Sequence, residues 1–312
     1  MTRSRHISTL GIALAVTLTL SSSASIVSAD PPSAHRIVRG GAGYVLLSER
    51  ANQDGTFTDT WGVAGKPRVL VTGRPGLTVT ITADAVGVTA PNIDKTRVGA
   101  ADNAISNYLA AGRSPNKDAT AVGASQLAQG SPRSAAPAFN GQIYDSWCLT
   151  IWSPDNKVRT DGCVTRYLDT DLGGGDWYMA HKVNASGISN DTNVFLPDRL
   201  DQVKAWMTYP AGNQYVQWTP GSSNAVGACG STNIGISSSQ TGISYTQSQT
   251  VCPNTFGPVN LDTTTTSPSF GSVWDGPAVQ QLYRGTESVD LLHNPPGASL
   301  GATLWLYEHW VN

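Results

Sequence analysis

Four cysteines, all after residue 140 of the 312-residue chain, constrain the fold most: Cys148, Cys163, Cys229 and Cys252. An even number of cysteines in an exported chain indicates disulfides, and this spacing lacks the close Cys/His pairs of a zinc site. Pairing Cys148 with Cys163 centres an antiparallel hairpin between residues 155 and 156. The turn then falls at residues 153–158, Ser-Pro-Asp-Asn-Lys-Val, which is favourable turn chemistry.

Pairing Cys229 with Cys252 centres a second hairpin between residues 240 and 241. This register predicts one apolar face and one face of small polar side chains, which supports the pairing because a one-residue slip would mix the two. Each closed loop would contribute about 3 kcal/mol on the chain-entropy model. The other connectivities of four cysteines stay open. The apolar face consists of Ile234, Ile236, Ile243, Tyr245 and Val251.

The first thirty residues have the three parts of a secretory signal peptide. Arg3 and Arg5 precede an apolar run over residues 7–20, and small residues follow up to Ala29. The run is shorter than the roughly 20 residues that span a bilayer. We therefore expect residues 1–29 to be removed, with cleavage after Ala24 as the second choice. The protein is expected to be secreted and extracellular, without a stable membrane anchor.

Charged residues make up only 13% of the chain, well below the usual quarter. Residues 141–312 carry 7 basic against 14 acidic side chains. A surface that binds phosphates would have the opposite balance, so we expect no nucleic acid partner and no anionic membrane. The abundance of small polar residues and glycine favours short strands joined by many turns.

The pattern predicts an all-β protein: a disulfide-bearing antiparallel β-sandwich, preceded by a small β-rich segment with one helix. Residues 30–95 form this β-rich segment, in which 68–72 and 77–82 are expected to pair as a hairpin across a Gly-Arg-Pro-Gly turn. Apolar residues at three- and four-residue spacing predict a helix over 96–111. Residues 112–138 contain no aromatic side chain, and residues 112–139 are expected to form a linker or mobile loop.

Residues 140–312 are expected to form the sandwich domain, because eight of the nine tryptophans and eight of the ten tyrosines lie there. Short strands separated by turn residues are typical of this architecture. The expected strands are 143–152, 158–168, 177–183, 203–209, 214–218, 228–236, 243–251, 279–283, 288–293 and 302–311.

The last expected strand offers a candidate ligand-binding face. Trp305, Tyr307 and His309 alternate along it, and aromatic side chains on one face of a sheet make a platform for sugar rings. The competing interpretation, and the one we favour, is a central strand that is buried on both faces.

Two further sites depend on carboxylates. Glu287 and Glu308 are two of only three glutamates and are candidates for the acid and base of a glycan-cleaving enzyme. The glycine-rich loop with Asp169, Asp171 and Asp176 is a candidate calcium site, because Ca²⁺ takes several oxygen ligands in a flexible loop. A solvated acidic turn is the alternative for this loop.

The sequence lacks Gly-Asp-Ser-Gly-Gly, the nucleophile motif of trypsin-like proteases. His181, His293 and His309 lack metal-ligand spacing, so we expect each to be a hydrogen-bonded structural residue. The amphipathic hairpin at 231–251 is typical of sandwich proteins and also of pore-forming toxins.

These observations favour a secreted, non-catalytic binding protein, with glycan or cell-wall material as its ligand. The first alternative is a secreted hydrolase that cleaves glycans with paired carboxylates. The second is a membrane-active β-hairpin toxin.

Overall fold

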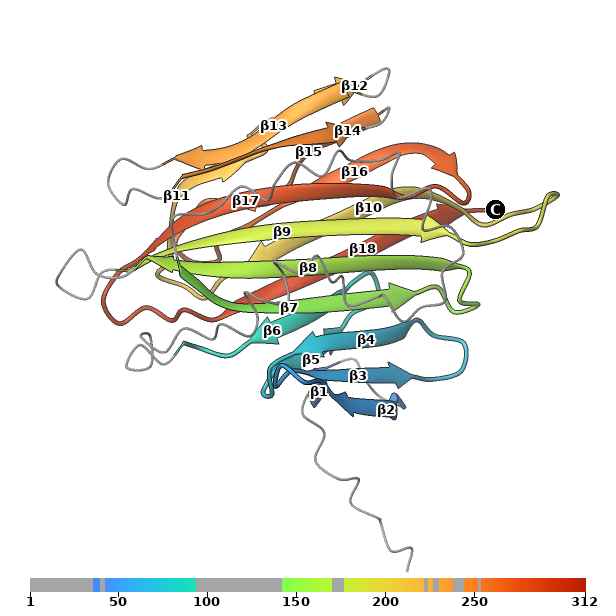
Figure 1. Ribbon diagram of the computed structural model, residues 1–312, viewed down its shortest axis with the longest axis horizontal. Coiled ribbons are helices and arrows are strands. Elements are labelled where there is room, and N and C mark those ends of the chain that lie inside the picture. Colours follow the sequence, from blue (N-terminus) through green and yellow to red (C-terminus); the bar gives the residue numbers. More distant parts are fainter. Residues whose placement is uncertain are drawn as a thin grey trace, which may run out of the picture. The chain divides into compact units, whose positions relative to one another are not determined.

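The computed structural model describes residues 36–39, 43–93, 142–169, 177–221, 224–226, 230–237, 244–251 and 254–312. This part of the chain contains strands and no helix, which confirms the all-β sandwich (Figure 1). Two eight-stranded sheets pack face to face, and every pair of neighbouring strands is antiparallel except β1 with β5. The helix expected over 96–111 and the linker expected over 112–139 lie outside the described residues.

Sheet A is assembled from strands at both ends of the chain. Its centre is the C-terminal strand, which pairs with β6 on one side and β10 on the other. In spatial order its strands are β1 (Arg36–Arg39), β5 (Thr78–Ile81), β6 (Val86–Ala90), β18 (Ala302–Val311), β10 (Arg199–Thr208), β16 (Ser269–Val279), β15 (Asn254–Asp262) and β12 (Asn224–Val226).

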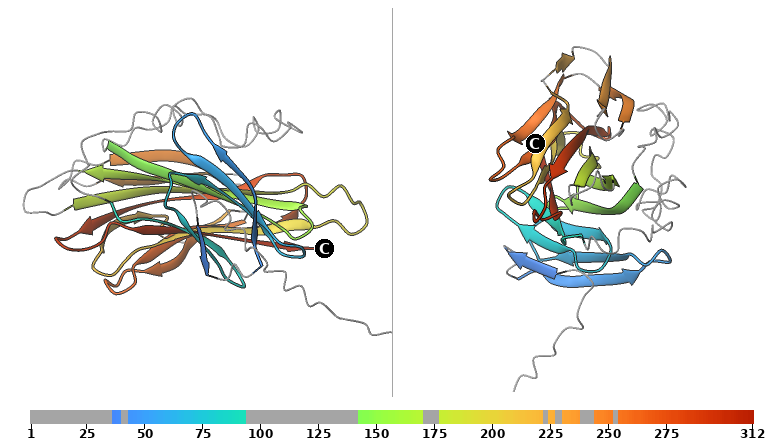
Figure 2. Two further views of the ribbon diagram at one scale, coloured as in Figure 1. Left: turned by 90° about the horizontal axis from the view of Figure 1, so that it is seen from below. Right: turned by 90° about the vertical axis from the view of Figure 1, so that its left-hand side faces the viewer.

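Sheet B has the same number of strands and also joins early and late segments, since β4 pairs with β7. In spatial order its strands are β11 (Gln214–Thr219), β17 (Arg284–Asn294), β9 (Trp177–Ser189), β8 (Val158–Asp169), β7 (Gln142–Trp152), β4 (Arg68–Gly73), β3 (Phe57–Gly62) and β2 (Val45–Ala51). The described strands before residue 94 therefore lie in the same two sheets as most of the strands after residue 141 (Figure 2).

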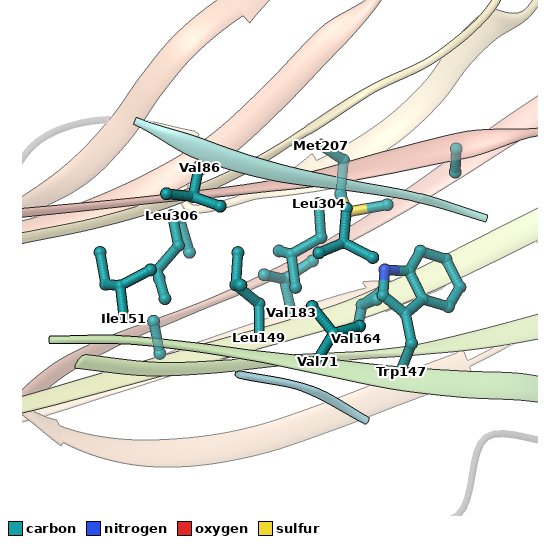
Figure 3. Close-up of a cluster of buried hydrophobic side chains, with 14 of the residues drawn as sticks. Val71, Val86, Trp147, Leu149, Ile151, Val164, Val183, Met207, Leu304 and Leu306 are labelled. Atoms are coloured by element: carbon teal, nitrogen blue, oxygen red, sulfur yellow. The ribbon is translucent and has the colours of Figure 1, made fainter. Parts of the chain in front are cut away.

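The core lies between the two sheets and follows from the two-residue period of the strands. Along β7, Trp147, Leu149 and Ile151 are buried, and from the opposite sheet Leu304 and Leu306 of β18 point toward them (Figure 3). The burial of apolar surface is the main force that holds the sheets together, and it contributes a free energy of roughly 25 cal/mol for each Å² removed from water.

The hairpin expected for residues 68–82 is wrong, because β4 belongs to sheet B and β5 to sheet A. The chain changes sheets at Gly73. A Cβ there would lie 2.5 Å from Cδ1 of Leu77 and 3.0 Å from Cβ of Trp147, so a side chain at this position would displace that of Leu77. Both strands bury apolar side chains in the same core, and that alternation is as compatible with facing sheets as with a hairpin.

The hairpin of β7 and β8 has the predicted register, with Cys148 directly opposite Cys163 and a disulfide between them. Its turn is closed by side chains: Ser153 Oγ accepts hydrogen bonds from the backbone N–H groups of Lys157 and Val158, at 3.1 and 3.0 Å. Asn156 adopts the left-handed conformation, with a φ of 61°, which asparagine tolerates well. The turn chemistry read from the sequence is therefore confirmed.

A third, two-stranded sheet consists of β13 (Gly230–Ser237) and β14 (Ser244–Val251). Its register, with Ile236 opposite Tyr245, is the one derived from pairing Cys229 with Cys252, although both cysteines lie outside the described residues. Ile236 is buried together with Ala180, Val289 and Leu291 of sheet B. In the described part of the chain no helix has the length and apolarity needed to cross a membrane.

Candidate functional site: an aromatic surface and the cleft beside it

The C-terminal strand β18 alternates as the sequence predicts. Leu304, Leu306 and Glu308 are buried toward the core, whereas Trp305 and Tyr307 are half-buried and His309 is exposed. The interpretation of β18 as a strand buried on both faces is therefore wrong. Among the described strands, none forms a further layer over the outer face of sheet A along β18.

The neighbouring strand β10 extends this aromatic face. Trp206 lies directly opposite Trp305, and Lys204 lies opposite Tyr307. The two indole rings are nearly parallel, with an interplanar angle of 10° and 6.0 Å between their centroids. The Trp305 indole is held in place by Nε1, which donates a hydrogen bond to Thr208 Oγ1 at 3.0 Å. Sequence reasoning missed Trp206, because the pairing of β10 with β18 is not local.

The Trp305 indole lies flat on the sheet, because its neighbour on β6 is Gly87. A Cβ at Gly87 would lie 2.7, 2.8 and 2.9 Å from three consecutive atoms of the six-membered ring. Nearly equal distances to adjacent ring atoms mean that the Cβ would meet the face of the ring rather than its edge. Since a Cβ points out of the sheet, the ring is parallel to the sheet surface.

Another glycine accommodates Trp206 on its other side. Gly271 of β16 is opposite Trp206, and a Cβ at this glycine would lie 2.3 Å from Cβ of Trp206 and 2.1 Å from the carbonyl oxygen of Ala205. We call Trp206, Trp305 and Tyr307 the aromatic surface. Parallel rings bordered by glycines make this part of the sheet flat and accessible to a planar ligand.

Polar groups border the aromatic surface on the same face. Lys204 Nζ lies 4.7 Å from the centre of the Tyr307 ring, His309 Nδ1 lies 2.7 Å from Asp201 Oδ1, and Gln202 Nε2 donates to Asp275 Oδ2 at 2.6 Å. Burial, together with the charges of Asp201 and Asp84, raises the pKa of Tyr307, which keeps its phenol neutral and able to donate a hydrogen bond. These polar groups include both hydrogen-bond donors and hydrogen-bond acceptors.

The aromatic surface ends at a cleft of about 790 Å³. The cleft is bounded by the turn between β5 and β6, the end of β18 and the chain around residues 66 and 67. Tyr307 and His309 line it too, so it is continuous with the aromatic surface. Polar and aromatic residues of its wall include Tyr44, Lys66, Asp84, Glu308 and Trp310.

Glu308 is the most unusual group of this cleft. Burial raises the pKa of its carboxyl to about 8, and the charge of Asp161 adds to this rise, while the Thr160 hydroxyl acts in the opposite direction. Oε2 is enclosed and has no hydrogen-bond partner among the described residues. Glu308 is therefore protonated at neutral pH and able to donate a proton or a hydrogen bond.

The two glutamates singled out from the sequence do not come together. Glu287 shares the outer face of β17 with Val289 and Leu291, and its Oε1 lies 3.3 Å from Lys182 Nζ. Glu308 points into the space between the sheets. Sheet B separates the two carboxyls, so this pair cannot flank one bond.

The predicted calcium loop falls largely outside the part of the chain that the structure describes. Asp171 and Asp176, and the side chain of Asp169, lie outside the described residues. Over the residues that the structure does describe, no three His, Cys, Asp or Glu side chains gather as metal ligands.

All three histidines considered in the sequence are hydrogen-bonded, as expected. His181 Nδ1 lies 2.9 Å from Asp290 Oδ1, His293 Nδ1 lies 3.3 Å from Gln214 Oε1, and His309 pairs with Asp201. His181 and Asp290 are fully buried, and the hydroxyl of Tyr209 donates to the second oxygen of Asp290 at 2.5 Å. We assign this triad to the core, because it lines neither the cleft nor the aromatic surface.

Comparison with models of known protein families and with curated protein sequences gave no match.

Proposed function

We propose that the chain is an extracellular binding protein whose aromatic surface holds a polysaccharide, such as a glycan of a cell wall. The supporting observation is the pair Trp206 and Trp305, two parallel indoles on an open sheet face. Sugar rings present flat faces of C–H groups, which pack on aromatic rings, and hydroxyl edges, which need hydrogen-bond partners.

The arrangement along the strand fits an extended ligand. Tyr307 follows Trp305 by two residues on the same face, a distance of roughly 6.6–6.8 Å. The aromatic surface therefore repeats along β18 as well as across to β10. Lys204, His309 and Gln202 stand beside the rings, where the hydroxyl groups of a sugar chain would lie.

The test is depletion of the protein, without residues 1–29, from solution by insoluble cellulose, chitin and bacterial cell walls. Trp206→Ala and Trp305→Ala are expected to weaken binding at least tenfold, because a central aromatic contact contributes about 2 kcal/mol or more. Trp152→Ala is the matched control. Trp152 is also half-buried on a sheet face, but it lies beside the guanidinium groups of Arg68 and Arg159 in sheet B.

Binding that persists in both Trp206→Ala and Trp305→Ala, or that falls equally in Trp152→Ala, would contradict the proposal. Binding to none of the three materials would exclude these glycans as ligands. Thermal unfolding of each variant establishes whether a loss of binding reflects a loss of fold.

A hydrolase acting on the same glycan is a second candidate, and Glu308 favours it. A protonated carboxyl in a cleft that continues from a binding surface is suited to donate a proton to a leaving group. Asp84 is a second carboxyl of this cleft and would take the role that the sequence assigned to Glu287. Soluble fragments released by the protein, and absent with Glu308→Gln and with Asp84→Asn, would support this candidate over the non-catalytic one.

A further inference from the structure

The connection between β9 and β10 carries three consecutive hydrophobic side chains in full contact with solvent. Val194, Phe195 and Leu196 are 81%, 89% and 69% exposed. The connection projects beyond the ends of the strands that it joins (Figure 1). Soluble proteins rarely expose neighbouring large apolar residues, and such patches mark interaction sites.

The loop is held in shape by its own polar side chains. Asp191 accepts hydrogen bonds from the backbone N–H groups of Asn193 and Asp198, both at 2.9 Å. Asn193 in turn accepts one from the N–H of Phe195 at 3.0 Å. Pro197 has no N–H, so the loop satisfies much of its own backbone and exposes mainly hydrocarbon at its end.

A second connection braces the first and adds to its apolar character. Gln280 Nε2 donates to the backbone oxygens of Asp191 and Asn193, the latter at 3.2 Å. Next along the chain, Leu282 and Tyr283 are 44% and 40% exposed. We call Val194, Phe195 and Leu196 the apolar tip.

The charged groups beneath the apolar tip are one lysine and three aspartates. Lys157 Nζ lies 3.1 Å from Asp191, 3.5 Å from Asp198 and 3.5 Å from Asp155. Asp191 and Asp198 are themselves buried. The loop therefore has no row of cationic side chains that would select anionic lipids, and its attraction to a partner has to be hydrophobic.

We propose that the apolar tip inserts into the interfacial region of a phospholipid membrane whose headgroups carry no net charge. Consecutive residues on a protruding loop point in different directions, so a flat protein surface would cover only one side of the tip. A fluid hydrocarbon layer surrounds such a tip on all sides and buries Val194, Phe195 and Leu196 together. The inference is independent of glycan binding, since the apolar tip and the aromatic surface share no residue.

The experiment is co-sedimentation with phosphatidylcholine vesicles, using the protein without residues 1–29. The apolar run over residues 7–20 would itself bind lipid, and residues 33–312 form a compact unit that contains every described strand. Replacing all three residues by serine (V194S/F195S/L196S) is expected to lower the partition coefficient at least tenfold. Added salt is expected to leave the wild-type binding unchanged, because phosphatidylcholine vesicles carry no net charge and the proposed contact is apolar.

The control variant, Val45→Ser with Leu47→Ser, removes two other exposed hydrophobic residues, which are 57% and 56% exposed. It is expected to bind vesicles like the wild type. The variant Phe195→Trp adds a direct readout: brominated lipids should quench its fluorescence more than that of the wild type, because only the new indole enters the bilayer.

No vesicle binding by the wild type would overturn the proposal, and so would binding that survives the triple serine substitution. Self-association in sedimentation velocity that disappears in the triple variant, without vesicle binding, would overturn it in favour of a second copy of the chain as the partner. Thermal unfolding is expected to stay unchanged, since exposed loop residues contribute little to stability.

Discussion

The indole of Trp305 rests face down on Gly87, and this contact makes the outer face of sheet A flat. Any side chain at Gly87 would lift the ring, since even a methyl group would lie under 3 Å from three of its atoms. Gly87→Ala is therefore expected to weaken polysaccharide binding at least tenfold and to destabilise the fold by about 1–3 kcal/mol through overpacking. The shift of the indole should change its fluorescence.

A matched control separates the two effects of Gly87→Ala. A methyl group at Gly301 would have only ordinary contacts, the nearest being Ser299 Oγ at 3.4 Å, and Gly301 lies outside the aromatic surface. Gly301→Ala is expected to leave binding unchanged. Wild-type affinity in Gly87→Ala, measured by depletion on the same material, would mean that the position of Trp305 does not matter for the ligand.

Asp290 joins two buried side chains across the core. It lies within hydrogen-bond distance of His181 Nδ1 and accepts from the Tyr209 hydroxyl. Asp290→Ala would leave both groups without this partner in a buried environment, and we expect a loss of about 2–5 kcal/mol in the free energy of unfolding. Asp290→Asn keeps the shape and one acceptor oxygen, so it should cost less. Urea unfolding measures the stability of both variants. Equal stability of Asp290→Ala and the wild type would show that the hydrogen bonds of Asp290 contribute nothing to the free energy of unfolding.

The disulfide between Cys148 and Cys163 closes a loop with a sequence separation of 15 residues. The chain-entropy model assigns such a loop about 3 kcal/mol, through the restriction of the unfolded chain. Replacing both cysteines by alanine should lower the free energy of unfolding by about this amount and leave the hairpin register intact. Thermal unfolding in the oxidised state tests the loss, and an unchanged midpoint would mean that the link does not stabilise the fold.

The sequence predicted best what depends on neighbouring residues. The registers of both hairpins followed from the cysteines, and the last strand, 302–311, was predicted with its alternation intact. In these segments the turn residues and the two-residue period point to the same structure. The shared face of Trp305 and Tyr307 could therefore be predicted, but the favoured interpretation, a strand buried on both faces, was wrong.

Features that depend on pairing between strands far apart in the sequence could not be predicted. Trp206 alternates with buried Val203, Ala205 and Met207, a signal that it faces outward, but nothing local shows that it lies opposite Trp305. Strands β15 and β16 were missed because glycine and proline interrupt their patterns. The strand expected over 279–283 is wrong: Val279 ends β16, and Gln281 has a φ of 57° in the connection to β17.

Glu308 gives the protein a pH dependence of stability with a defined sign. Its pKa is about 8 in the folded protein against an ordinary value of 4.5, so the folded state binds the proton more tightly than the unfolded chain. The stabilisation of the folded state by this tighter proton binding is fully present below about pH 4.5, shrinks as the pH rises, and is lost above about pH 8. A pKa difference of one between the folded and unfolded states corresponds to about 1.4 kcal/mol, so the change is on the order of a few kcal/mol.

Glu308→Gln replaces the protonated carboxyl by a neutral group of the same shape and should abolish this slope. The variant is expected to resemble the wild type at pH 5 and to be more stable at pH 9, because only the wild type must then carry a buried charge. Glu49→Gln, at an exposed position of β2, is the control for removing one carboxyl group from the surface. Urea unfolding at pH 5, 7 and 9 measures the difference. Parallel pH profiles for Glu308→Gln and the wild type would show that Glu308 ionises normally, and would remove the basis for its role as a proton donor in the cleft.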